Sequence, residues 1–132
     1  MKNSILLLSL CFAMLTNAQP SELIQGAGIQ ISETSYDFGE ITQTSDGEYV
    51  YCEFEVTNTG NEPLIISKCQ GSCGCTTPEC SKTPILPGQS TTIKVRYDSH
   101  RLGNFSKKVT IYSNAENEPE KTIRIKGMVL AS

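Results

Sequence analysis

The sequence lacks the residue patterns that mark most enzymes and nucleic-acid-binding proteins. Its 132 residues include a single histidine, His100, and they contain no Gly-x-Ser-x-Gly motif, no glycine-rich phosphate loop and no calcium-binding loop. Acidic residues outnumber Lys and Arg by 14 to 11, and no basic cluster is present that could follow a phosphate backbone. We therefore predict a protein that is not an enzyme, that has no catalytic residue and no cofactor, and that does not bind nucleic acid.

Helical periodicity is missing as well. After the first eighteen residues, no stretch repeats apolar side chains at the i, i+3, i+4, i+7 spacing of an amphipathic helix. The longest apolar run, Ile5–Leu15, is too short to cross a bilayer. We therefore predict an all-β protein with no membrane span in the mature chain.

The first eighteen residues have the features of a secretory signal peptide. Lys2 supplies the positive charge, Ile5–Leu15 forms the apolar region, and small residues stand three and one positions before a cleavage site after Ala18. Export to the periplasm or the extracellular space is the prediction. A lipoprotein signal ending at Cys11 is the alternative, but a bulky leucine precedes this cysteine and the apolar run continues past it.

The remaining residues are enough for one domain with a hydrophobic core. Residues 19–28 are polar and contain two glycines, so we predict a flexible spacer there and a domain over residues 29–130. Short runs of alternating apolar and polar residues predict six or seven strands of a β-sandwich. The clearest runs are Ile29–Ile41 with a bulge at Gly39, Tyr49–Thr57, Leu64–Ser67, Thr92–Tyr97, Phe105–Ile111 and Ile123–Val129.

The run Tyr49–Thr57 shows which side chains face the core. Period-two alternation directs Tyr49 and Tyr51 outward, where they are candidate contacts for a protein or glycan partner but also simply suit a strand. The same alternation directs four residues inward: Val50, Cys52, Phe54 and Val56.

Cysteines dominate the segment between the third and fourth predicted runs. Five cysteines remain after the predicted cleavage, and four of them lie between Cys69 and Cys80. In an exported protein, closely spaced cysteines indicate disulfides before metal sites. Among three possible pairings of these four we favour Cys73–Cys75 with Cys69–Cys80, because Gly74 lets Cys-Gly-Cys close a small ring and the other two lie at the mouths of the loop. The odd cysteine is then Cys52, predicted to be a buried free thiol, with a bond to one of the four as the alternative.

Two other roles are open for the cysteine segment. An exposed i, i+2 disulfide would suit thiol exchange, although no helix is predicted nearby to lower the pKa of a thiol. The sulfur atoms could instead hold zinc or Cu(I), with His100 as a further ligand, although their spacing is not a standard zinc pattern. The candidate metal ligands are Cys69, Cys73, Cys75, Cys80 and His100.

Several motifs, taken in order, resemble the bacterial secreted domain-of-unknown-function 1573 family, which is similar to the immunoglobulin-like domains of major sperm protein and Hydin type. The motifs are Tyr36–Ile41, Phe54–Ile66, Ser72–Pro78, Leu86–Ser90, Gly103–Phe105, Tyr112–Asn114 and Ile125–Gly127. The resemblance implies an immunoglobulin-like β-sandwich of about seven antiparallel strands and implies little about activity. The Cys-Gly-Cys pair is common in that family, whereas Cys52, Cys69 and Cys80 look like additions in this chain.

These observations together predict an exported, non-enzymatic interaction or scaffold module with a disulfide-stapled segment. Its expected partner is an envelope or extracellular protein, and the open sheet edges of such a sandwich make strand addition a candidate binding mode. The alternative function is a periplasmic thiol-redox or metal-handling protein that acts through the cysteine segment.

Overall fold

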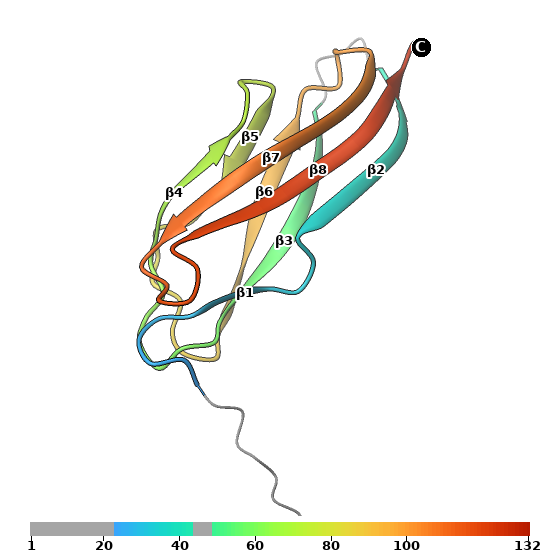
Figure 1. Cartoon of the computed structure of the whole chain (residues 1–132). Helices are drawn as coiled ribbons and strands as arrows, with labels where there is room; N and C mark the ends of the chain where they lie inside the picture. Colours follow the sequence, from blue (N-terminus) through green and yellow to red (C-terminus); the bar gives the residue numbers. More distant parts are fainter. Residues whose placement is uncertain (1–22, 44–48) are drawn as a thin grey trace, which may run out of the picture.

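The structure is a computed structural model that describes residues 23–43 and 49–132 (Figure 1). The predicted signal peptide and a turn expected at residues 45–47 lie outside the described residues. In the described part there is no helix long and apolar enough to span a membrane. The strands are β1 (Ile29–Ile31), β2 (Ser35–Thr42), β3 (Val50–Asn58), β4 (Ile66–Gly71), β5 (Thr76–Glu79), β6 (Ser90–Tyr97), β7 (Gly103–Ser113) and β8 (Glu120–Leu130).

The strands form two four-stranded sheets that pack face to face. One sheet has the order β1-β3-β6-β5 and the other has the order β2-β8-β7-β4. Figure 1 shows β2 along one side of the molecule and β4 with β5 along the opposite side. The all-β sandwich is therefore confirmed, with eight strands in the described residues. The expectation of antiparallel strands throughout is wrong for one pair, because β2 runs parallel to β8.

The core lies between the sheets where the alternation places it. On β3, Cys52, Phe54 and Val56 are buried and Val50 is half-buried, which confirms the predicted inner face. The opposite sheet contributes aliphatic side chains from β7 and β8, and burying each one stabilises the fold by roughly 1.5–3 kcal/mol. These are Val109, Ile111, Ile123, Ile125 and Val129.

The single strand predicted over residues 29–41 is two strands in different sheets. Ile29 and Ile31 are buried on β1, which pairs with β3. The chain then crosses to the other sheet through residues 32–34, where the Thr34 carbonyl accepts the Arg124 N–H at 2.8 Å. Alternation continues on both sides of the crossing, so periodicity alone cannot reveal it. The predicted bulge is confirmed, because the register shifts around Gly39, which has φ 67°.

From Ile24 onward the described part of the predicted spacer is hydrogen-bonded to the sandwich, and its flexibility stays a prediction. The Ile24 N–H donates to the Thr59 carbonyl at 3.2 Å, and the Gly26 carbonyl accepts the Asn61 N–H at 2.8 Å. A Cβ on Gly60 would lie 2.0 Å from the Gly26 carbonyl oxygen. Two backbones can therefore cross here only because position 60 has no side chain.

The strand predicted over Leu64–Ser67 is shifted toward the cysteines. Leu64 makes an isolated bridge with Ile85, and β4 begins only at Ile66. Cys69 consequently lies on a strand, and β5 follows after a short turn. The segment predicted as a loop is a strand–turn–strand unit that leads from the edge of one sheet to the edge of the other.

Candidate functional site

A disulfide between Cys69 and Cys80 joins the two sheets at one side of the molecule. Cys69 lies on β4, an edge strand of one sheet, and Cys80 directly follows β5, an edge strand of the other. Their Cα atoms are 6.3 Å apart. This is the pairing that the sequence analysis favours, and it places a covalent bond between two edges that no backbone ladder connects.

A second disulfide, Cys73–Cys75, closes the turn between β4 and β5, and its Cα atoms are 5.3 Å apart. The Thr76 hydroxyl oxygen lies 3.8 Å from each of the two sulfur atoms. The Cys75 N–H donates to Cys73 Sγ at 3.3 Å. Cys75 is 4% exposed, whereas Cys73 is half-buried. The two sulfur atoms therefore have unequal access to solvent and share one hydroxyl neighbour.

Cys52 is the free cysteine of the described residues, and it is buried. It lies on the inner face of β3, directly across from Val95 on β6. Burial, and to a smaller extent the neighbouring Glu53 carboxylate, raise the pKa of its thiol to about 11. Since the thiolate is the reactive form of cysteine, this side chain acts as a small hydrophobic residue of the core.

His100 lies near the cysteine turn, but its ring contacts other residues. Antiparallel pairing of β5 with β6 brings the turn after β6 to the cysteines, where the Asp98 N–H donates to the Cys75 carbonyl at 2.9 Å. The His100 ring nitrogen Nδ1 lies 2.7 Å from Asp98 Oδ1, which also accepts the His100 backbone N–H. The backbone bond and then the ring bond lower the pKa of Asp98.

The four sulfur atoms named as candidate metal ligands are all in disulfides, so they offer no thiolate to a metal ion. Across residues 23–43 and 49–132, no three His, Cys, Asp or Glu side chains group as a metal site. The geometry of the described residues therefore gives the zinc or Cu(I) alternative no support.

Two tyrosines stand on the outer face of the first sheet, as the alternation predicts. Tyr49 is 51% exposed and Tyr51 is 57% exposed. The Lys94 ammonium lies 4.0 Å from the Tyr51 ring centroid, and the Arg96 guanidinium lies 5.3 Å from that of Tyr49. Each such cation–π contact contributes roughly 0.5–1 kcal/mol at an exposed site. One face of each ring is thus already occupied by a cation from β6.

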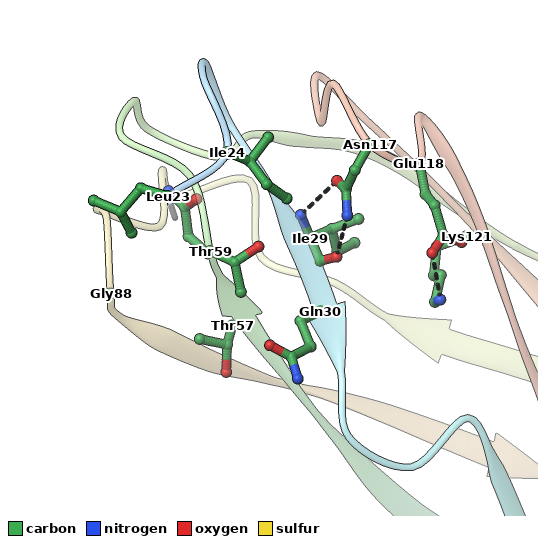
Figure 2. A pocket seen from close by; sticks show the side chains of 11 residues that line it. Leu23, Ile24, Ile29, Gln30, Thr57, Thr59, Gly88, Asn117, Glu118 and Lys121 are labelled. Carbon is green, nitrogen blue, oxygen red and sulfur yellow. Dashed lines mark hydrogen bonds and ion pairs between the residues drawn. The ribbon is translucent and has the colours of Figure 1, made fainter. Parts of the chain in front are cut away.

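The edge strand β1 is covered by a side chain that imitates a strand neighbour. Asn117 accepts the Ile29 N–H with Oδ1 and donates from Nδ2 to the Ile29 carbonyl, each at 2.9 Å (Figure 2). Beside it lies a hollow of about 590 Å³ lined in part by Leu23 and Ile24. The amide satisfies the backbone groups that an added strand would use.

The other three edges differ in how they are protected. Pro78 lies on β5 and has no N–H to donate, and the Cys69–Cys80 bond ties β5 to the edge of β4. In the described residues, β2 has one strand neighbour, β8, and no proline, disulfide or amide cap of this kind. Its eight residues are mostly exposed. The bulge at Gly39, whose N–H donates to Asp37 Oδ1 at 2.8 Å, interrupts β2 at one point. Apart from this bulge, β2 is the least protected of the four edge strands in the described residues.

The seam where β2 approaches β3 is acidic and aromatic. A hollow of about 180 Å³ lies there, and Tyr36 at its rim is 42% exposed. The carboxylates of Glu33, Glu53 and Glu55 line it, and they take part in none of the ion pairs of the described residues. A ligand on the β2 edge would therefore meet negative charge beside an aromatic ring.

Sequence reasoning missed two asparagines that organise one end of the sandwich. Asn58, interpreted only as a turn residue, is fully buried. Its Oδ1 accepts the N–H groups of Gly28 and Gly60, and its Nδ2 donates to the carbonyls of Glu62 and Ile85. Asn117, in a loop described only as acidic, caps β1. Neither role has a signal in the sequence, because each depends on contacts between distant segments.

Comparison with known proteins identifies one family and a fold. The model of a family described as "Protein of unknown function (DUF1573)" matches residues 29–129. The comparison with curated proteins finds no match.

Solved structures show the same fold. A protein of unknown function from Porphyromonas gingivalis W83 matches with TM-score 0.67 and 22% identity, over 85% of this chain and 51% of that chain. The human CEP192 PapD-like domain 7 matches with TM-score 0.62 and 10% identity, over 79% of this chain and 86% of that one. The YadV chaperone matches with TM-score 0.51 and 19% identity, over 79% and 52%. This chain thus spans about half the length of the Porphyromonas protein.

Proposed function

The chain belongs to the DUF1573 family of proteins of unknown function, and from that premise we propose that it is an exported, non-enzymatic interaction module. It binds an extended segment of an envelope or extracellular protein by strand addition to the free edge of β2. The observation that carries the proposal is the contrast between this edge, which has only the bulge at Gly39, and the other three, which carry an amide cap, a disulfide or a proline.

Two features support export. Residues 1–18 have the composition of a signal peptide with cleavage after Ala18, which leads to the periplasm or the extracellular space. Two disulfides in a domain of this size fit an oxidising compartment. The structural similarity to the YadV chaperone is consistent with a sandwich that binds other proteins.

Strand addition supplies affinity through backbone hydrogen bonds and specificity through side-chain contacts. A strand with one neighbour leaves alternate N–H and C=O groups for a second. The seam beside β2 adds an aromatic ring, Tyr36, and the carboxylates of Glu33, Glu53 and Glu55. The partner segment therefore alternates apolar residues with Lys or Arg, since basic side chains complement this charge.

Two peptides test the proposal directly, one alternating Lys with Val and one alternating Glu with Val, both as long as β2. We expect the Lys–Val peptide to slow hydrogen exchange of the β2 amides, and the Glu–Val peptide to have little effect. The double variant E53Q/E55Q should weaken binding by roughly two- to thirtyfold at low salt, because each of the two exposed ion pairs contributes about 0.2–1 kcal/mol. The variant E62Q/E116Q removes the same charge from another part of the surface and should bind as the wild type does.

Protection that appears on β1, β4 or β5 instead of β2 would contradict the proposal. So would equal binding of the two peptides, or binding of neither at millimolar concentration.

A further inference from the structure

The turn that carries Cys73 and Cys75 is held in place without its disulfide. The Thr76 N–H donates to the Cys73 carbonyl at 3.2 Å, and the Asp98 N–H donates to the Cys75 carbonyl at 2.9 Å. On the other side, the Ser72 N–H donates to the Lys108 carbonyl at 2.9 Å. These bonds tie the turn to β6 and β7, so two thiols formed by reduction would remain side by side. A site held in this way can open and close its disulfide without unfolding.

The two sulfur atoms offer different access to an attacking thiolate. Cys73 is half-buried, whereas Cys75 is 4% exposed. Gly74 between them is exposed, and a Cβ built on it would meet no atom within 4 Å. Of the two cysteines, Cys73 is therefore the residue more open to solvent, and we take it as the one that a second molecule reaches.

Hydrogen-bond donors surround this pair of sulfur atoms. The Cys75 N–H points at Cys73 Sγ at 3.3 Å, and the Thr76 hydroxyl lies 3.8 Å from both sulfurs. The Thr76 hydroxyl can stabilise a thiolate at either sulfur and so make it a better leaving group, whereas the Cys75 N–H can do so only for Cys73. In the described residues, no hydrogen bond to the sulfurs of Cys69 or Cys80 accompanies the other disulfide. Among the described residues, hydrogen-bond donors that favour thiol–disulfide exchange therefore surround Cys73–Cys75 and not Cys69–Cys80.

We propose that Cys73–Cys75 is a thiol–disulfide exchange site whose substrate is a dithiol, with Cys73 as the attacked sulfur and Cys75 as the leaving and resolving sulfur. A thiolate of the substrate attacks Cys73 Sγ, the Cys73–Cys75 bond breaks, and Cys75 leaves as a thiolate that takes up a proton. The second substrate thiol, as its thiolate, then attacks the mixed disulfide and releases Cys73. The substrate loses two electrons and two protons to become a disulfide, and the protein gains them as two thiols.

This inference is independent of strand addition, because it uses the opposite side of the sandwich from β2. The remaining thiol, Cys52, does not interfere, since burial keeps it protonated at neutral pH. Thr76 acts as a positioning residue through its hydroxyl, and Thr77 beside it is exposed and provides a matched control.

The first test uses the wild-type protein and dithiothreitol as the dithiol. The folded protein is treated with increasing dithiothreitol near neutral pH, quenched with acid, alkylated and mapped by peptide mass. We expect Cys73 and Cys75 to be alkylated at least about tenfold faster than Cys69 and Cys80, with the circular dichroism spectrum unchanged. Opening of both disulfides at one rate, opening of Cys69–Cys80 first, or opening only with unfolding would overturn the proposal.

The second test assigns the roles of the two sulfurs. The thiol left in C75A should react with an aromatic disulfide reagent at least about tenfold faster than the thiol left in C73A, with Cys52 as an internal slow standard. Adding T76V to C75A should move the pH profile of the Cys73 reaction to higher pH, whereas adding T77V should not. Equal rates in C75A and C73A, or an unchanged pH profile with T76V, would overturn the assignment. If either variant fails to fold, the wild-type mapping still decides the proposal.

Discussion

Removing the two disulfides separately should cost different amounts of stability, although both lie in one short segment. Cys69 and Cys80 are 11 residues apart, and Cys73 and Cys75 are 2 apart. Closing a loop in the unfolded chain removes more entropy when the loop is longer. The chain-entropy relation gives about 3 kcal/mol for the longer loop and about 1.5 kcal/mol for the shorter one. The double variant C69A/C80A should therefore lose about 1.5 kcal/mol more than C73A/C75A.

Loss of packing must be separated from loss of the cross-link. The variant C52A removes one buried sulfur without touching a disulfide, so it measures the packing term, which we expect to be about 1 kcal/mol. Cys75 is as deeply buried as Cys52, whereas Cys69, Cys73 and Cys80 are only half-buried. Loss of packing should therefore cost C69A/C80A no more stability than it costs C73A/C75A. Any larger loss of stability in C69A/C80A then measures the effect of loop closure.

Urea unfolding of the chain from Gln19 onward provides the measurement. With a slope of about 1.5 kcal/mol per molar urea for a domain of this size, the midpoint of C69A/C80A should lie about 1 M below that of C73A/C75A. Equal midpoints for the two double variants would refute the loop-closure reasoning. A lower midpoint for C73A/C75A would also refute the loop-closure reasoning. It would show that the Cys73–Cys75 disulfide stabilises the fold more than the Cys69–Cys80 disulfide does.

Three further predictions test other parts of the structure. Asn58→Ala should destabilise the fold by about 3 kcal/mol or more in urea unfolding, since it leaves the buried N–H groups of Gly28 and Gly60 without their acceptor. A loss below 1 kcal/mol would contradict this role. Asn117→Ala should uncover the edge of β1 and promote self-association, visible by analytical ultracentrifugation, whereas an unchanged monomer would count against the cap. The folded pKa of Cys52 exceeds its unfolded value of 9.0, so its contribution to stability should fall as pH rises above 9 and the unfolded thiol ionises. Comparing wild type with C52A over that pH range checks the sign, and a loss below pH 8 would contradict it.

The sequence was sufficient to predict the sandwich because burial here follows strict alternation. On β3 the inward set from Val50 to Val56 occupies the core, and on β8 Ile123 and Ile125 do the same. The positive φ angle of Gly39 also matches the predicted bulge. These features depend on neighbours along the chain, and such local signals are the ones that a single sequence carries.

Contacts between distant segments were not predictable in the same way. Asn58 gathers backbone groups from residues 28 to 85, and Asn117 bonds to Ile29 across 88 positions. The cysteine pairing lies between these cases, because any four cysteines can pair in only three ways and the positions of β4 and β5 favour one of them. The crossing at residues 32–34 was missed because two short strands in different sheets alternate as one longer strand would.

That crossing also determines which edge is free. Had the chain from Ile29 to Ile41 formed one strand beside β3, the second sheet would end at β8, and the seam lined by Glu33, Glu53 and Tyr36 would not exist. Because the chain changes sheet, β1 is short enough for one amide to cap, while β2 runs parallel to β8 with its outer side unpaired. At the opposite side, a disulfide joins the edges of β4 and β5. In the described residues, the amide, disulfide and proline that protect β1, β4 and β5 have no counterpart on β2 beyond its bulge at Gly39, and this contrast supports the β2 edge as the surface that a partner strand would use.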